Sequence, residues 1–219
     1  MLVKDFITKE IPVLKSFDTV EFALAQMDDF KLKHLPVLAD GVYRYLVSEK
    51  ELFAYPATDM KLGDTSSFAP FVMPEHHLYE VLRLVSHFNL SLIPVINAEG
   101  EYQGVVTRDR LTDVLAEVCN VETEGSVIVL ELLPQDYVLT EISRLIESNN
   151  AHVLSLFTHI DNETGKLILS VKIDLEDASP VIRSFERFNY TVLYYFMKKG
   201  MVDDLLKKRM DELLYYMNM

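Results

Sequence analysis

The sequence predicts an α/β protein, of α+β type, with two βαββα-type repeats, a βαββαβ segment and a C-terminal amphipathic helix. Three observations predict this class. A repeat with an offset of 58 to 59 residues occupies the first half of the chain. After Cys119 the order of strand-like and helix-like patterns changes, and from Met201 a broad apolar helical face follows. We place the boundaries at 1–61, 62–121, 122–198 and 199–219.

Two matching strand sequences carry the repeat. His34-Leu35-Pro36-Val37-Leu38 resembles Leu92-Ile93-Pro94-Val95-Ile96, and the two prolines lie 58 residues apart. The same offset pairs Phe30 with Phe88 upstream. One inserted loop residue then makes the offset 59, which pairs Gly41 with Gly100. A register held over about 35 residues with a single slip indicates an internal duplication.

Each repeat shows the same order of elements. An apolar stripe with spacings of three and four residues predicts a first helix, and Asp18 with Glu21 predicts its capping box. His76 stands where the first repeat has Asp18, so that cap is expected to be lost. A strand, a glycine turn, a second strand and a helix follow. In the first repeat we predict a strand at 35–38, a second strand that ends at Val47 and a helix at 48–55. In the second repeat we predict a strand at 92–96, a second strand that ends at Val106 and a helix at 107–118.

The segment after Cys119 predicts a four-stranded antiparallel sheet with both helices on one face. Asp161 to Gly165 is expected to form a hairpin turn rather than a calcium loop, because the twelve-residue ligand spacing is missing. The expected strands are 127–132, 153–160, 166–173 and 190–196. One expected helix is lined from Val138 to Ile146 and ends near 149–150, and the other covers 181–188.

Composition excludes several function classes. The chain has 219 residues, of which 49% are hydrophobic and 25% charged, so it is expected to fold. A net charge of −13 argues against nucleic acid or an anionic membrane as a partner. The one cysteine excludes an internal disulfide and cysteine-based zinc sites, and the histidines show no metal-ligand spacing. With neither a signal-peptide nor a membrane-helix pattern, we expect a cytoplasmic protein.

Residues 1–119 resemble a tandem pair of CBS domains. The resemblance rests on Pro36-Val37 and Pro94-Val95, and on Gly104-Val105-Val106-Thr107 leading into a helix. Residues 125–198 resemble an ACT-like domain with a ferredoxin fold. Together they resemble bacterial regulatory proteins in which an ACT-like domain follows a CBS pair.

The resemblance implies an adenine-nucleotide site at each strand-to-helix junction, where a Ser/Thr-x-x-Asp pattern is typical. Ser48 and Glu51 match it in the first repeat. Thr107 and Arg110 stand there in the second, and a guanidinium cannot accept ribose hydroxyls. Arg108 or Arg110 could contact a phosphate instead. The walls of an adenine site are expected from Leu35, Pro36, Val37 and Val47. The alternative is that Ser48 and Thr107 simply cap their helices.

The expected function is a non-catalytic regulatory protein that senses an adenosyl ligand of the AMP, ADP or ATP class in the cleft of the CBS pair. No nucleophile–base pair is visible in the sequence, and no cofactor is expected. The alternative is a ligand-free scaffold or interaction module that regulates a partner enzyme or transporter. A homodimer is expected, because an apolar tail face needs a covering surface; that face consists of Val202, Leu206, Leu213 and Met217. The cover is expected to be a second chain or the ACT-like sheet of the same chain.

The first strand–helix loop of the ACT-like segment lacks the glycine that ACT domains often use for close backbone approach. Asp136-Tyr137-Val138-Leu139 runs through it without one. We therefore expect no amino acid to bind near Asp136. The alternative role for Asp136 is that of a helix cap.

Overall fold

The computed structural model describes residues 1–63 and 68–197, which divide into two compact units. The first unit comprises Met1–Leu115, and the second begins at Ala116. Each unit has its own hydrophobic core. The mixed α/β class predicted from the sequence is confirmed.

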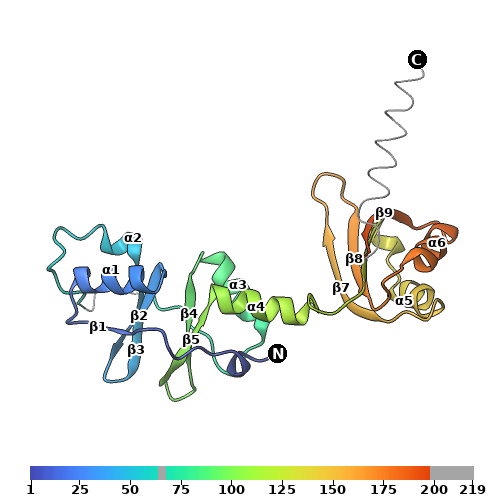
Figure 1. Cartoon of the computed structure of the whole chain (residues 1–219). Helices are drawn as coiled ribbons and strands as arrows, with labels where there is room; N and C mark the ends of the chain where they lie inside the picture. Colours follow the sequence, from blue (N-terminus) through green and yellow to red (C-terminus); the bar gives the residue numbers. More distant parts are fainter. Residues whose placement is uncertain (64–67, 198–219) are drawn as a thin grey trace. The chain divides into compact units, whose positions relative to one another are not determined.

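The first repeat builds a three-stranded sheet covered by two helices (Figure 1). Strand β1 (Leu14–Lys15) pairs in parallel with β2 (His34–Ala39), which pairs antiparallel with β3 (Val42–Ser48). The helices are α1 (Val20–Asp29) and α2 (Glu49–Leu52).

The predicted start of α1 is wrong by one residue. Thr19 is the N-cap, and its hydroxyl accepts the Phe22 N–H. The carboxylate of Asp18 instead accepts the N–H of Lys15 at 2.8 Å, in the turn before the helix. Asp18 therefore closes the preceding turn, which leaves the capping position to the next residue.

The second repeat reproduces this arrangement. Its elements are α3 (Leu78–His87), β4 (Leu92–Ile96), β5 (Tyr102–Thr107) and α4 (Arg108–Val118), and β4 pairs antiparallel with β5. The cap expected to be lost is present, because the His77 ring accepts the Tyr79 N–H at 3.3 Å.

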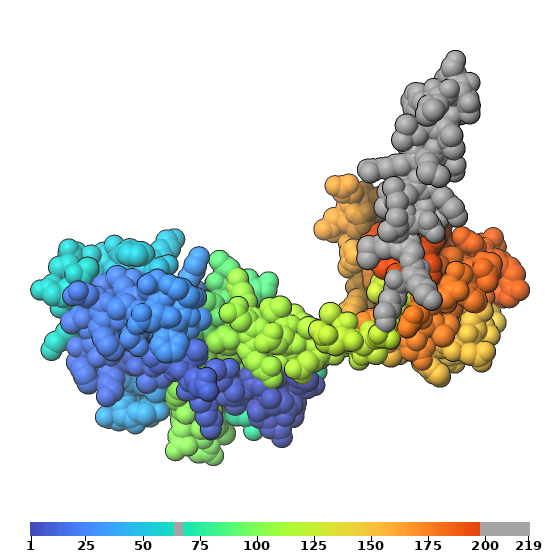
Figure 2. Space-filling model, in the orientation of Figure 1, coloured from blue at the N-terminus to red at the C-terminus, as the bar shows by residue number. Residues whose placement is uncertain are grey.

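The two repeats exchange the segments that precede them. Thr8, ahead of the first repeat, pairs with Val105 of the second through two backbone hydrogen bonds of 2.8 and 2.9 Å. Phe68, ahead of the second repeat, accepts the N–H of Leu46 in the first. Figure 2 shows the N-terminal segment lying over the second repeat. The core of the first unit is consequently shared by both repeats.

The second unit has the predicted βαββαβ order and adds a 3-10 turn, η2 (Pro134–Asp136), after the first strand. The four antiparallel strands lie in the order β7-β8-β6-β9, and α5 and α6 lie on one face of the sheet (Figure 1). The elements are β6 (Ser126–Leu132), α5 (Leu139–Glu147), β7 (Val153–Ile160), β8 (Leu167–Ile173), α6 (Ser179–Arg187) and β9 (Thr191–Phe196).

The hairpin between β7 and β8 forms as predicted, with Asp161 holding it together. One carboxylate oxygen of Asp161 accepts the Glu163 N–H, and the other accepts the Thr164 hydroxyl, each at 2.9 Å. These hydrogen bonds lower the pKa of Asp161 because they favour its charged form.

The predicted C-terminal helix, residues 199–219, lies outside the described residues, which end at 197. Within the described ranges, no helix has the length and apolar character needed to cross a membrane.

Candidate functional site

The junction between β3 and α2 brings Ser48 and Glu51 together as a capping box. The Glu51 N–H donates to the Ser48 Oγ at 3.2 Å. In return, Glu51 Oε2 accepts both the backbone N–H and the hydroxyl of Ser48, each at 2.8 Å. The capping alternative therefore describes what these residues do here. A carboxylate offers about four acceptor positions, so Glu51 retains capacity for ligand hydroxyls.

The predicted wall residues lie in the core beneath this junction. Leu35 and Val37 have no exposed surface and Val47 has 4%, while Pro36 is also buried. Leu35 pairs with Val47 in the β2–β3 ladder. Their assignment as walls of an adenine site stays a prediction, and it requires the core to open at this point.

The equivalent junction of the second repeat is organised differently. The Thr107 hydroxyl accepts the N–H of Arg110 at 3.1 Å, so Thr107 also caps its helix. The Arg108 guanidinium donates to Asn89 Oδ1 at 3.1 Å, at the end of α3. Arg108 and Asn89 border a groove of about 320 Å³ between α3 and α4, whose other lining residues are Leu82, Val85, Ser86, Leu111, Thr112 and Leu115.

His34 lies where the two junctions approach one another. It faces Ser48 in the β2–β3 ladder, and its ring Nδ1 accepts the N–H of Ser91, just before β4, at 3.2 Å. Burial lowers the pKa of His34. The charge of Glu51 opposes that shift, and those of Arg108 and Lys33 add to it. The structure thus brings Glu51 and Arg108 close to a single histidine.

His34 was not among the residues selected from the sequence. Its signal was the difference between the repeats, because the equivalent position in the second repeat is Leu92. A polar residue at one copy of an otherwise apolar position indicates a local role.

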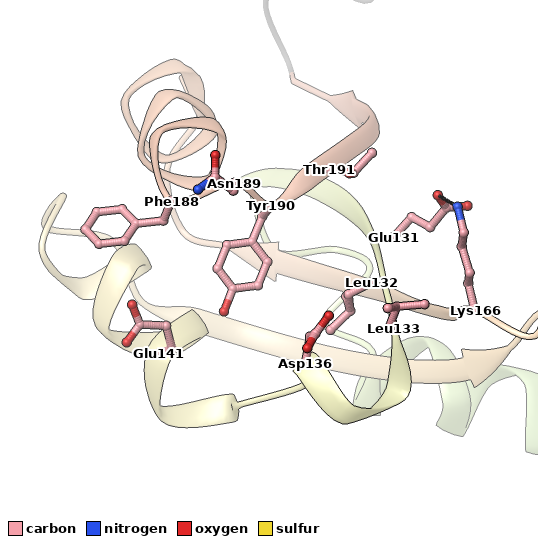
Figure 3. A pocket seen from close by; sticks show the side chains of 10 residues that line it. All are labelled: Glu131, Leu132, Leu133, Asp136, Glu141, Lys166, Phe188, Asn189, Tyr190 and Thr191. Atoms are coloured by element: carbon pink, nitrogen blue, oxygen red, sulfur yellow. Dashed lines mark hydrogen bonds and ion pairs between the residues drawn. The ribbon is translucent and has the colours of Figure 1, made fainter.

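A second candidate site is a cavity of about 400 Å³ in the second unit (Figure 3). Lys166 and Glu131 form an ion pair of 2.5 Å at its edge. The hydroxyl of Tyr190 points toward Glu141 and Asp136. Burial raises the pKa of Tyr190, and those two carboxylates raise it further. The remaining lining residues are Leu132, Leu133, Phe188, Asn189 and Thr191.

Asp136 does not cap α5, so that alternative is wrong. The N-cap is Val138, and Asp136 ends the 3-10 turn two residues earlier. Because a capping side chain must stand immediately before the first helical residue, Asp136 lies too early. Its side chain borders the cavity instead. The expectation that no amino acid binds there thus rests on the missing glycine alone.

The family model described as "CBS domain" matches residues 3–58 and 65–117. The first unit is a tandem pair of CBS domains. This match confirms the CBS pair predicted from the sequence. The prediction rested on Pro36-Val37, on Pro94-Val95 and on the segment from Gly104 to Thr107. CBS pairs are in general regulatory modules.

Solved structures are similar to slightly more than half of the chain. A CBS domain pair/ACT domain protein from Thermotoga maritima is 24% identical over 53% of this chain and 98% of its own, with a TM-score of 0.49. CBSX2 in complex with AMP is 25% identical over 53% of this chain and 97% of its own, with a TM-score of 0.47. The AcuB-type acetoin utilization protein from Vibrio cholerae is 19% identical over 56% of this chain and 95% of its own, with a TM-score of 0.49.

Proposed function

We propose that the CBS pair is a non-catalytic sensor that binds an adenosyl ligand of the AMP, ADP or ATP class at the junction of its two repeats. The observation that supports this proposal is the placement of a hydroxyl, a carboxylate and a guanidinium around His34, contributed by both repeats. A ligand bound across them would contact both repeats at once. Such a ligand can shift the packing of the pair if its affinity differs between two arrangements.

The polar groups match the parts of a nucleotide. Glu51 would accept the ribose hydroxyls, because its carboxylate accepts hydrogen bonds and the guanidinium of Arg110 cannot. Arg108 would donate to a phosphate, in competition with its present bond to Asn89. The first repeat is therefore the proposed ribose side, and the second repeat the proposed phosphate side.

A thermal shift titration with AMP, ADP and ATP tests the proposal, and calorimetry measures the affinity. Glu51→Gln is the informative variant, because its amide oxygen can still accept the Ser48 N–H and keep the helix cap. We expect roughly ten- to a hundred-fold weaker binding, since hydrogen bonds to a charged group contribute about 1.5–3 kcal/mol. Glu49→Gln, in the same helical turn, is the matched control and should bind normally.

The alternative is a scaffold whose junction stays empty. Two observations favour it. Ser48 and Glu51 already form hydrogen bonds with one another, and Arg110 occupies the position where a carboxylate is typical. If millimolar AMP, ADP and ATP all fail to stabilise the protein, the sensor proposal fails for these ligands. If binding survives Glu51→Gln and falls with Arg108→Gln, the function stands and the ribose assignment is wrong.

The second unit is proposed to be an ACT-like domain, on the basis of its βαββαβ topology and four-stranded antiparallel sheet. The expectation that it binds no amino acid near Asp136 is tested by calorimetric titration with the common amino acids. Saturable binding that Asp136→Ala abolishes would contradict it, and would assign the cavity beside Tyr190 as the binding site.

The chain is further proposed to form a homodimer. The sheet face opposite α5 and α6 exposes aromatic side chains, with Phe157, Tyr194 and Phe196 between 44% and 52% exposed. Light scattering of the intact chain tests this, and a monomer at micromolar concentration would contradict it. Deleting residues 201–219 in the same assay tests whether the tail takes part, because an unchanged dimer would exclude a dimerising tail.

A further inference from the structure

The two CBS repeats are joined by a polar contact between His34 and Ser91. The Ser91 N–H donates to His34 Nδ1 at 3.2 Å, and the Ser91 Oγ lies 3.1 Å from the same nitrogen. The hydroxyl oxygen also accepts the N–H of Lys33 at 3.1 Å. Three hydrogen-bonding contacts therefore link the start of β2 to the residue before β4.

This contact requires a neutral imidazole. Nδ1 can accept the Ser91 N–H only while it carries no proton, and a protonated ring presents two N–H donors. After protonation, Nδ1–H and the Ser91 N–H would be two donors facing one another, and they would repel each other. A half-buried backbone donor that loses its acceptor is unfavourable, so the charged ring and the hydrogen bond from the Ser91 N–H exclude one another. The Ser91 Oγ can accept from a protonated Nδ1, so the backbone hydrogen bond is the one that protonation breaks.

The surroundings of His34 oppose its protonation. The ring is half-buried, and burial disfavours the charged form. Arg108, at the start of α4, and Lys33, its neighbour in the chain, both repel a positive ring. Glu51 of α2 is the opposing charge and attracts it, and Ser48, which faces His34 across the ladder, is neutral.

We propose that His34 is a proton-sensitive latch between the CBS repeats, closed by the neutral ring and opened when the ring takes up a proton. The equivalent position of the second repeat holds Leu92, which is fully buried and cannot titrate. The latch does not depend on nucleotide binding, although it adjoins the proposed site, so either proposal can fail alone.

The direction of the pH effect follows from the lowered pKa of His34. Between that pKa and the ordinary value of 6.5, the folded protein binds fewer protons than the unfolded chain. Stability is therefore fully present above 6.5. It falls as the pH drops from 6.5 to the pKa of folded His34, and it levels off below that value.

Proton NMR of the intact chain, without nucleotide, tests the latch directly. The His34 ring should titrate below the ordinary histidine value of 6.5. The hydrogen-exchange protection factor of the Ser91 amide should fall roughly tenfold between about pH 7.5 and pH 5, as expected for the loss of one hydrogen bond. A His34 midpoint at or above 6.5, or constant protection of Ser91, would overturn the proposal.

Two variants separate the latch from general acid destabilisation. His34→Asn places an amide oxygen near the position of Nδ1, so it can accept the Ser91 N–H without titrating in this range. Its melting temperature should fall less on acidification than that of the native chain. Ser91→Ala keeps the backbone donor and should retain the native pH dependence. Equal pH profiles for the native chain and His34→Asn would contradict the latch, and the native NMR titration decides the question if His34→Asn fails to fold.

Discussion

The two repeats of the CBS pair share a frame, meaning their strand pairing and buried apolar positions, and they differ in a few polar residues. In the first repeat Leu14 pairs in parallel with Val37, and Val72 pairs with Val95 in the same way in the second. The polar residues diverge. Glu51 corresponds to Arg110, His34 to Leu92, and the hydroxyl cap of Thr19 to the ring of His77.

The comparison shows that frame and chemistry are specified by different residues. Buried apolar positions repeat because each packs into a core built by both copies. Residues at strand ends and helix starts are free to change, because they meet solvent or one another. A sensor that needs unlike groups on its two sides can thus be made from a duplicated frame.

A substitution at Gly104, where the N-terminal segment packs against the second repeat, is expected to lower the free energy of unfolding the most. Gly104 has φ +138, and an added Cβ would lie 2.6 Å from Ile7 Cγ2 and 2.7 Å from the carbonyl oxygen of Thr8. Because that oxygen belongs to the exchanged segment, Gly104→Ala should lower the free energy of unfolding by about 2–4 kcal/mol. Urea denaturation measures this.

Gly100→Ala is the matched control for that substitution. Its φ is +86, but nothing lies within 4 Å of an added Cβ, so only backbone strain of about 1–2 kcal/mol is expected. Equal losses in the two variants would show that the close approach of the N-terminal segment contributes nothing.

The helix caps at the two strand-to-helix junctions are expected to differ in strength. Ser48→Ala removes a hydroxyl that both accepts from and donates to Glu51, whereas Thr107→Ala removes a hydroxyl that accepts the Arg110 N–H. We expect a loss of about 1–2 kcal/mol for Ser48→Ala and about 1 kcal/mol for Thr107→Ala. Thermal denaturation of both variants decides the order, and a larger loss for Thr107→Ala would contradict it.

Exchanging the caps of the first helices should have the smallest effect. His77→Thr gives the second repeat the cap of the first, with a hydroxyl in place of a ring nitrogen at 3.3 Å. The variant also loses the edge-on contact of His77 with Tyr79, so a net gain of about 0.5 kcal/mol is expected. The reciprocal Thr19→His should be destabilising by a similar amount. Calorimetric melting of both variants tests this, and a gain from Thr19→His would contradict it.

Apolar spacing was sufficient to predict the main helices and strands of both units. Positions such as Val81 and Val85, or Leu169 and Val171, repeat with the period of the element that buries them. Strand β1 was not predicted, because two residues are too short to show a period. The assignment of the α1 cap to Asp18 failed, because Asp18 and Thr19 are both good caps and only the course of the chain distinguishes them.

The site was less predictable than the fold. Ser48 and Glu51 were found from their spacing, but the hydrogen bonds between them depend on the geometry of the helix cap. The contact of His34 with Ser91 joins residues of different repeats, so it cannot be predicted from the local spacing of apolar residues. The exchange of Thr8 to the second repeat is invisible for the same reason.

The exchanged segments also constrain the order in which the chain can fold. Thr8 finds its partner Val105 about 100 residues later in the sequence. During synthesis at about 5–20 residues per second, the N-terminal segment must wait several seconds without its partner strand. Contacts of such long range slow folding because the intervening loop has to close first. The first repeat therefore leaves the ribosome incomplete, and a chain that stopped after it would lack both the strand that receives Thr8 and the Phe68 carbonyl that receives the Leu46 N–H.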